Sequence, residues 1–175
     1  LSVISAARPK IADYPFTTLA PNLGVVALSG HRTFVVADIP GIIEGAAEGK
    51  GLGLQFLRHI ERTRCLAFLI PIDAMDWQAE YDQLRHEVRQ YSEELAAKPH
   101  CVVFTKLDLL GEPYVPEIDA PEAFGRFSIS AAGREGLDTL IAAWWDLLLS
   151  MKKEEGRIEL DVQLPSRVRP ARAHP

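Results

Sequence analysis

The apolar residues of this chain recur in two patterns, short continuous runs and helical spacings, which predicts strands and helices in alternation. Apolar runs of strand length lie at residues 23–28, 33–37, 66–72, 101–104 and 127–129. Residues 29–32 (S-G-H-R) separate the first two runs and favour a hairpin. The run at 66–72 is uninterrupted, as expected for a strand buried on both faces of a parallel sheet.

Helical spacing is clearest between residues 76 and 97. Its apolar residues recur at steps of three and four: Trp77, Tyr81, Leu84, Val88, Tyr91 and Leu95. This pattern predicts an amphipathic helix whose aromatic residues contact the core. Further helices are predicted at 55–64 and 137–151, and residues 1–7 read as the end of another.

The alternation predicts a doubly wound α/β domain of the P-loop NTPase type, with a mostly parallel sheet and helices on both faces. We assign residues 1–151 to this domain. Residues 152–175 break the pattern, with a possible short strand at 158–162 and a Pro/Arg-rich end. We interpret 152–175 as a linker toward a further, C-terminal domain.

Composition narrows the class of protein. The chain has 175 residues, 47% of them apolar and 25% charged, which fits one globular domain with a real core. A net charge of −5 argues against a broad basic face, so direct DNA binding is not expected. No apolar run is long enough to span a bilayer. Cys65 and Cys101 lie in apolar runs, which favours core thiols in a reducing cytoplasm.

Four short segments carry candidate chemistry, and three of them directly follow predicted strands. They are F-T-T at 16–18, D-I-P-G at 38–41, T-K-L-D at 105–108 and S-A-A at 130–132. No G-x-x-x-x-G-K-[ST] phosphate loop occurs in the sequence. The glycine-rich stretch 45–53 has the wrong spacing for one, because Gly45 is one residue too close to the G-K pair at 49–50.

Asp108 is the most discriminating of these residues. Guanine presents two adjacent donors, N1–H and its exocyclic amino group, and one carboxylate can accept both. Adenine lacks this pair and would leave the carboxylate without partners, which costs roughly 1–3 kcal/mol for a buried polar group. The stem of Lys106 could lie over the base, and the small residues 130–132 would let backbone N–H groups approach the guanine carbonyl. The plainer alternative is that Asp108 only caps a turn.

Asp38, Gly41 and Thr18 suit the phosphate end of such a ligand. An aspartate at a strand end can hold Mg²⁺ through water, a glycine N–H can meet a γ-phosphate, and a loop threonine can complete the Mg²⁺ shell. Each has a structural alternative, since D-x-P-G is also a turn sequence and Thr18 could be a solvated loop residue.

The longer motifs around these segments resemble the Obg family, within the translation-factor-related class of P-loop GTPases. The likeness lies in A-D-Y-P-F-T-T-L (12–19), P-N-L-G-V-V (21–26), D-I-P-G-I-I-E-G (38–45) and F-L-R-H-I-E-R-T (56–63). It covers roughly residues 1–150. By this resemblance, residues 16–20 form the first switch, 38–41 open the second, and 105–108 read guanine.

The resemblance implies a GTP/GDP-binding site and an Mg²⁺ ion bound directly by Thr18 and through water by Asp38. The residues implied to contact the nucleotide are Phe16, Thr17, Thr18, Leu19, Ala20, Asp38, Ile39, Pro40, Gly41, Thr105, Lys106, Leu107, Asp108, Ser130, Ala131 and Ala132. No residue is assigned as catalytic.

The implied function is slow, Mg²⁺-dependent GTP hydrolysis in the cytoplasm, coupled to movement of the switches. The large ribosomal subunit is the implied partner, with roles in its late assembly and in stress or growth control. Two alternatives are an interaction domain of the same fold without nucleotide, and another translation-class GTPase with a different partner.

Three departures from the family pattern matter. The chain begins just after the position of the phosphate loop, so we expect a sheet without its first central strand and weak or no GTP binding and hydrolysis by this chain alone. Thr105 replaces the usual asparagine, so Thr105→Asn in a complete domain should tighten GDP binding. Ile42 stands where many small GTPases have a glutamine that orients water.

Overall fold

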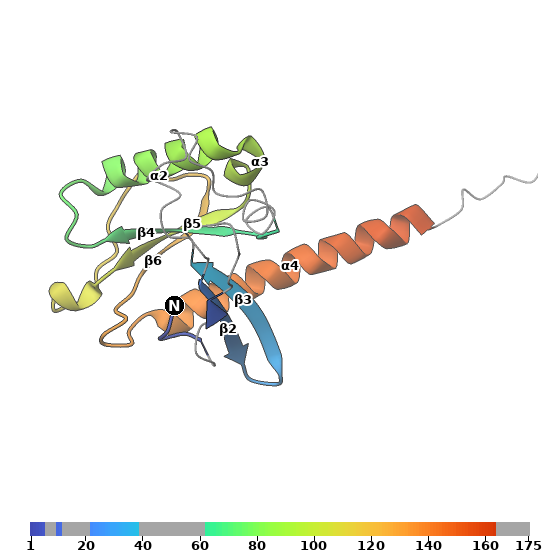
Figure 1. The fold of residues 1–175 in the computed structure, drawn as a ribbon, viewed down its shortest axis with the longest axis horizontal. Coiled ribbons are helices and arrows are strands. Elements are labelled where there is room, and N and C mark those ends of the chain that lie inside the picture. The colour runs from blue at the N-terminus through green and yellow to red at the C-terminus, as the bar shows by residue number, and fades with distance from the viewer. Residues whose placement is uncertain (6–9, 12–21, 39–61, 164–175) are drawn as a thin grey trace, which may run out of the picture. The chain divides into compact units, whose positions relative to one another are not determined.

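Two three-stranded sheets carry the described part of the chain, which covers residues 1–5, 10–11, 22–38 and 62–163 of this computed structural model (Figure 1). The first sheet is antiparallel, in the order β1-β2-β3, and the second is parallel, in the order β4-β5-β6. The predicted α/β class is confirmed.

The first sheet consists of β1 (Lys10–Ile11), β2 (Asn22–Leu28) and β3 (Arg32–Asp38). Strands β2 and β3 form the predicted hairpin, and their register pairs Asn22 with Asp38 at its open end. Gly30 and His31 both have positive φ, at 75° and 58°, in the tight turn. Hairpins favour primed turns, because the twist of these turns matches that of the strands, and type I′ turns require positive φ at both central residues.

Residues 1–5 form a single turn, where the sequence predicted the end of a helix. The N–H groups of Ile4 and Ser5 both donate to the carbonyl of Leu1, at 3.1 Å. The turn packs on Gly24 of β2, where an added Cβ would lie 2.8 Å from the Leu1 side chain. A single turn is too short to be a stable helix alone, so this packing fixes it.

The parallel sheet contains β4 (Leu66–Pro71), β5 (His100–Thr105) and β6 (Ala123–Ser128). All three predicted strands are present, and β6 begins four residues before the predicted start at 127. Burial of β4 on both faces is not observed: Phe68 and Ile70 are buried, whereas the side chain of Leu69 between them is 57% exposed.

The predicted helix at 76–97 is two helices, α2 (Trp77–Tyr91) and α3 (Glu93–Ala96). Ser92 separates them in an extended conformation, with φ −159° and ψ 120°. Its N–H closes α2 on the carbonyl of Val88, and its hydroxyl accepts the N–H of Leu95 to open α3. Serine favours such a cap because its side chain competes with the helical backbone for hydrogen bonds.

Helix α2 covers one face of the parallel sheet (Figure 1). Its N-terminus is capped by Asp76, whose carboxylate accepts the N–H of Ala79 at 3.0 Å. The buried core between helix and sheet is formed by Phe68, Ile70, Ile72, Tyr81, Val88, Leu95, Ala96, Val102 and Phe104. The aromatic residues at helical spacing are therefore core contacts, as predicted.

The connection from β5 to β6 contains one short 3₁₀ helix, η1 (Leu107–Leu109), and otherwise runs without a helix to residue 122. Parallel strands are more often joined through an α-helix. Here the side chain of Gln78 on α2 holds the connection instead. It accepts the N–H of Asp119 at 2.7 Å and donates to the carbonyl of the same residue at 3.2 Å.

Helix α4 runs over Leu137–Gln163, well beyond the predicted end at 151. The strand predicted at 158–162 is therefore wrong. Residues 152–155 are K-K-E-E, strong helix formers that offset the cost of the single glycine at 156. The chain divides into two compact units, 1–140 and 141–175.

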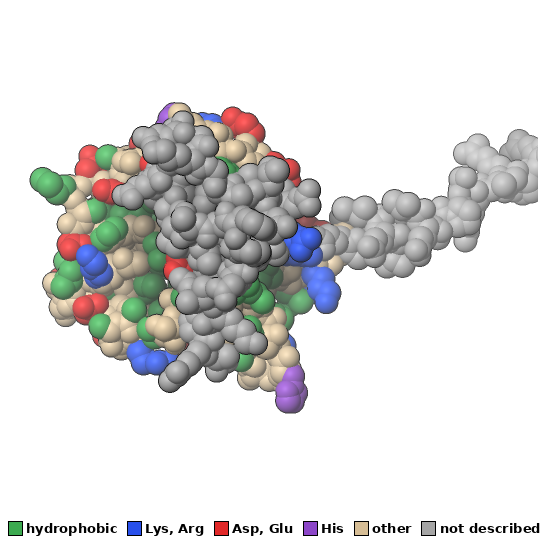
Figure 2. Space-filling view, viewed as in Figure 1, with side chains coloured by type: hydrophobic (Ala, Val, Ile, Leu, Met, Phe, Trp, Pro, Cys, Tyr) green, Lys and Arg blue, Asp and Glu red, His purple; other side chains and the backbone are tan. Residues whose placement is uncertain are grey.

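Among the described side chains in Figure 2, Lys and Arg lie at several separate places, between acidic and apolar ones. None of the helices within the described residues is long and apolar enough to cross a membrane. The helix predicted at 55–64, residues 6–7 of the first predicted helix, and the Pro/Arg-rich end at 164–175 lie outside the described residues.

Candidate functional site

The segments 105–108 and 130–132 lie together at the carboxyl edge of the parallel sheet. Thr105 ends β5, and Ser130 follows β6 by two residues. The N–H of Leu107 donates to the carbonyl of Ile129 at 3.0 Å, and the N–H of Ile129 donates to the carbonyl of Phe104 at 2.8 Å. These two backbone bonds continue the ladder past the strands and fix one loop against the other.

Ser130 joins the two loops through its side chain. It is fully buried, and its hydroxyl donates to Oδ1 of Asp108 at 2.5 Å while accepting the N–H of Gly133 at 2.8 Å. Asp108 itself is exposed. A buried, doubly bonded hydroxyl therefore orients a carboxylate that remains accessible to a ligand.

The loop after Ser130 has a defined shape. The N–H and carbonyl of Ser130 each bond to the backbone of Glu135, both at 3.1 Å, so residues 131–134 form a closed turn. Ala131 and Ala132 are exposed on it. We predicted from sequence that small residues here allow close backbone approach. The role of the serine hydroxyl was not predicted, although S-A-x after a strand already placed a hydroxyl beside the loop that carries Asp108.

A glycine completes this loop and starts α4. Gly136 has φ 70°, and a Cβ at that position would lie 2.2 Å from the carbonyl oxygen of Ser128. Only glycine satisfies both the left-handed conformation and this close approach. Gly136 thereby sets where the turn 131–134 returns to the sheet.

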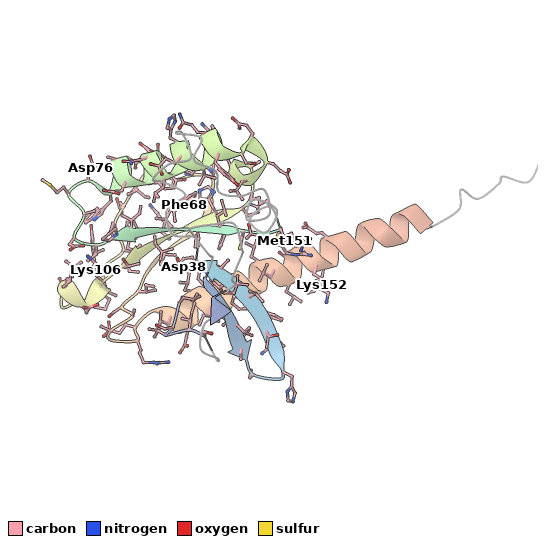
Figure 3. All side chains as sticks on the ribbon, in the orientation of Figure 1. Asp38, Phe68, Asp76, Lys106, Met151 and Lys152 are labelled. Atoms are coloured by element: carbon pink, nitrogen blue, oxygen red, sulfur yellow. The ribbon has the colours of Figure 1, made fainter. Side chains whose placement is uncertain are left out.

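Lys106 is held by an acidic residue that the sequence analysis did not identify. Its Nζ lies 3.1 and 3.2 Å from the two carboxylate oxygens of Asp73, in the loop between β4 and α2. Its backbone is left-handed, with φ 62° and ψ 36°. Figure 3 shows Lys106 and Asp76, the cap of α2, at the same end of the parallel sheet.

The remaining predicted site residues are placed as follows. Asp38 is the last residue of β3, in the antiparallel sheet, and its side chain is exposed. Residues 16–20, including the proposed Mg²⁺ ligand Thr18, and residues 39–41 lie outside the described residues. Within the ranges that are described, no three His, Cys, Asp or Glu side chains cluster as a metal site.

The arrangement suits recognition of a flat, polar base. Asp108 offers an oriented acceptor for two adjacent donors, and the methylene stem of Lys106 could contact a ring face. Ligands of α/β proteins bind at this edge of the sheet. A parallel α/β sheet with T-K-x-D after one strand and S-A after the next has the organisation of a guanine-nucleotide-binding protein.

Comparison with known proteins identifies the family. The model of the family described as 50S ribosome-binding GTPase matches residues 1–106, more than half of the chain, and the chain belongs to this family. The GTPase Obg of Chlorobium chlorochromatii is 55% identical over 150 residues, which cover 86% of this chain and 44% of that protein. The GTPase Obg of Bacteroides thetaiotaomicron is 46% identical over 170 residues, covering 96% and 43%.

The chain thus spans less than half the length of these curated relatives. The fold also resembles two solved structures. A protein described as a nucleolar GTP-binding protein 1 of Plasmodium falciparum aligns with TM-score 0.62 over 95% of this chain and 87% of its own. The cytosolic domain of L. pneumophila FeoB aligns with TM-score 0.55, over 83% and 60%. Both are 15% identical to this chain and show the fold alone.

Proposed function

We propose that this chain is the guanine-nucleotide-binding part of an Obg-type GTPase, in which Asp108 reads the base. The observation that carries the proposal is the bond from buried Ser130 to the exposed Asp108 carboxylate, at the edge of the sheet where such ligands bind. Membership of the 50S ribosome-binding GTPase family supports it, as do relatives named GTPase Obg.

The selectivity follows from hydrogen bonding. One oxygen of Asp108 is partly engaged by Ser130, and the carboxylate retains free lone pairs, since an ionised carboxylate has about four acceptor sites. N1–H and the exocyclic amino group of guanine would donate to it. Adenine has no matching donor pair, so a site built on this carboxylate rejects ATP. The other proposed base contacts come from Thr105 to Leu107 and from residues 130–132.

The phosphate end is proposed to involve residues 16–20 and 38–41. The chemistry of Asp38 fits an Mg²⁺ site, because its carboxylate is exposed at the end of β3 and Mg²⁺ prefers oxygen ligands. We propose that Asp38 holds the ion through water and Thr18 holds it directly. Bound Mg²⁺ would supply charge neutralisation at the phosphates.

We propose that hydrolysis is slow, as the resemblance to the Obg family implies. Ile42 follows the D-I-P-G segment and has no polar atom with which to orient an attacking water. Residues 105–108 and 130–132 bind the base and carry no proton-transfer role. We propose that Thr18 and Gly41 sense the γ-phosphate, and that its loss releases both switches and changes affinity for the large ribosomal subunit in the cytoplasm.

The test is GTP hydrolysis and ribosome binding by the chain carrying an added N-terminal segment with a G-x-x-x-x-G-K-[ST] loop. The proposal would be supported if the extended chain releases phosphate from GTP but not from ATP, and if the Asp108→Ala variant no longer releases phosphate from GTP. Co-sedimentation with large ribosomal subunits that depends on a non-hydrolysable GTP analogue would also support it. Equal release from ATP, or full GTP hydrolysis by Asp108→Ala, would contradict it.

A second candidate function is that of an interaction domain of the same fold that binds no nucleotide. That alternative predicts ribosome binding that is insensitive to any nucleotide and unaffected by Asp108→Ala. The same co-sedimentation experiment therefore separates the two.

A further inference from the structure

The loop between β4 and α2 brings Asp73 to the edge of the sheet where Lys106 lies. Pro71 and Thr105 form the last pair of the β4–β5 ladder. The N–H of Ile72 then donates to the carbonyl of Thr105 at 2.9 Å. Asp73 is therefore two residues past one strand end, and Lys106 one residue past its neighbour.

The backbone on both sides of Asp73 is fixed. The N–H of Ala74 donates to the carbonyl of Pro71 at 3.0 Å, and the indole N–H of Trp77 donates to the carbonyl of Ile72 at 3.1 Å. Asp76, three residues on, caps α2. The position of the Asp73 carboxylate is thus set by the sheet and by the start of the helix.

The backbone conformation of Lys106 is unfavourable for a residue other than glycine. Its left-handed backbone, φ 62°, disfavours any residue with a Cβ, and glycine would fit the turn more easily. Non-glycine residues held in this region cluster at functional sites, where the surrounding structure imposes the strain. The ammonium meets both oxygens of Asp73, so the methylene stem of Lys106 is fixed at its far end as well.

Fold stability does not account for this ion pair. The two side chains are 53% and 50% exposed, and ion pairs with such exposure contribute little to folding. The consequence of the pair is the position of the lysine stem, which lies on the same short segment as Asp108. Lys106 and Asp108 are two residues apart, on either side of buried Leu107.

We propose that Asp73 is a positioning residue of the nucleotide site: it holds the Lys106 ammonium so that the stem is ordered over the plane of the base before binding. The inference rests on the proposed function. A side chain ordered in advance loses less conformational entropy when ligand binds. Because the stem contacts a ring face, Asp73 supports affinity for any purine of similar shape, whereas Asp108 acts only on the donor edge of guanine.

The test is a double-mutant cycle with Asp73→Asn, Lys106→Met and the double variant, using fluorescent GDP and fluorescent IDP. Inosine lacks the exocyclic amino group of guanosine but has a similar ring face. The cycle is run in the chain itself or, if binding is too weak to measure, in the form with the added phosphate-loop segment. Glu112→Gln is the control, since it removes an exposed carboxylate from the connection that follows η1.

We expect Asp73→Asn to weaken GDP and IDP by the same factor, about two- to fivefold, and less at high salt, which screens the pair. In the Lys106→Met background the same substitution should have no effect, and the melting temperature should not change. Glu112→Gln should bind both nucleotides as the unsubstituted protein does.

Unchanged affinity in Asp73→Asn, or an equal loss with and without Lys106, would overturn this inference and leave the proposed function standing. A loss that falls on GDP alone would also overturn it, because the effect would then act on the donor edge. If the unsubstituted protein binds neither nucleotide in either form, the proposed function itself fails and the inference with it.

Discussion

The hydroxyl of Ser130 donates a 2.5 Å hydrogen bond to the carboxylate of Asp108, and so joins the loops that follow β5 and β6. The serine is buried and the aspartate is exposed, so a rigid part of the fold orients an accessible group. The two residues are 22 positions apart, and the parallel register of β5 and β6 brings them together. Base recognition in this account depends on both loops at once.

Replacing Ser130 with alanine should weaken both folding and guanine-nucleotide binding. The N–H of Gly133 would lose its acceptor and Asp108 its donor, which should lower the free energy of unfolding by about 1–3 kcal/mol. Affinity for GDP should fall several-fold because the carboxylate is no longer oriented. Urea unfolding and a GDP titration measure the two effects. Ser150→Ala, which removes an exposed hydroxyl of α4, is the control and should change neither the free energy of unfolding nor the affinity for GDP. If Ser130→Ala gives the same two values as this control, the role assigned to Ser130 is contradicted.

Exchanging Asp108 for asparagine should move base preference from guanine toward xanthine. An amide offers one acceptor and one donor group in place of two acceptors, and xanthine presents N1–H beside a carbonyl where guanine has its amino group. Discrimination of this kind is worth on the order of 1–3 kcal/mol for each unpaired group. Competition of XDP and GDP against a fluorescent nucleotide measures the shift. Equal losses for both bases would indicate that Asp108 is only a structural cap.

These site contacts show what the sequence could and could not provide. T-K-x-D after an apolar run predicted that Asp108 and Lys106 lie at a strand end, because the four-residue run at 101–104 is too short for a helix. The Ser130 hydroxyl and Asp73 were missed, since their roles depend on register between strands far apart in sequence. An acidic residue two positions after a buried strand was the available signal for Asp73.

The departures in the fold have local causes. Ser92 ends α2 because its side chain caps the next helix, which helical spacing alone does not reveal. The strand predicted at 158–162 is wrong because α4 continues through it, and the lysines and glutamates at 152–155 favour that helix. The exposure of Leu69 on β4 shows that a continuous apolar run does not ensure burial on both faces.

Stability should fall as the pH drops below the pKa of an unfolded histidine, because of His100. This residue is 2% exposed, and its Nε2 lies 2.8 Å from the hydroxyl of Tyr81. Burial and, secondarily, the nearby Arg85 guanidinium lower the pKa of His100 from its ordinary 6.5, while Glu122 opposes this. As the pH falls, the unfolded chain therefore binds a proton at His100 before the folded chain does. The free energy of unfolding is then constant in this respect above about pH 7, and it decreases as the pH falls through 6.5 toward the folded pKa.

The measurement is the free energy of unfolding in urea between pH 8 and pH 5.5, for the unsubstituted chain and for His100→Gln. The glutamine cannot titrate, so the variant should lose the part of the slope that His100 contributes, which is at most about 1.4 kcal/mol per pH unit. His86→Gln, at an exposed position of α2, is the control. A slope that is identical in all three proteins would show that His100 takes up its proton in the folded state.

Gly136→Ala should destabilise the chain far more than Gly111→Ala. Both glycines have positive φ, at 70° and 73°, so alanine costs about 1–2 kcal/mol of backbone strain at either position. A Cβ at 111 would meet open space, whereas at 136 it would lie 2.2 Å from the Ser128 carbonyl. Gly136→Ala should therefore lose at least about 1–3 kcal/mol more than Gly111→Ala, through overpacking. Thermal unfolding measures the loss of stability in the two variants. Equal losses would mean that the loop before α4 moves to accommodate the added Cβ without loss of stability.

The most direct test of the whole account is titration of fluorescent GDP with Mg²⁺, on this chain and on the chain with an added phosphate-loop segment before Leu1. We expect binding by the extended form that GTP competes away and ATP does not, with weak or no binding by the chain alone. If neither form binds, or if ATP competes as well as GTP, then Asp108 and Ser130 do not form a guanine site, and the interaction-domain alternative is the better description.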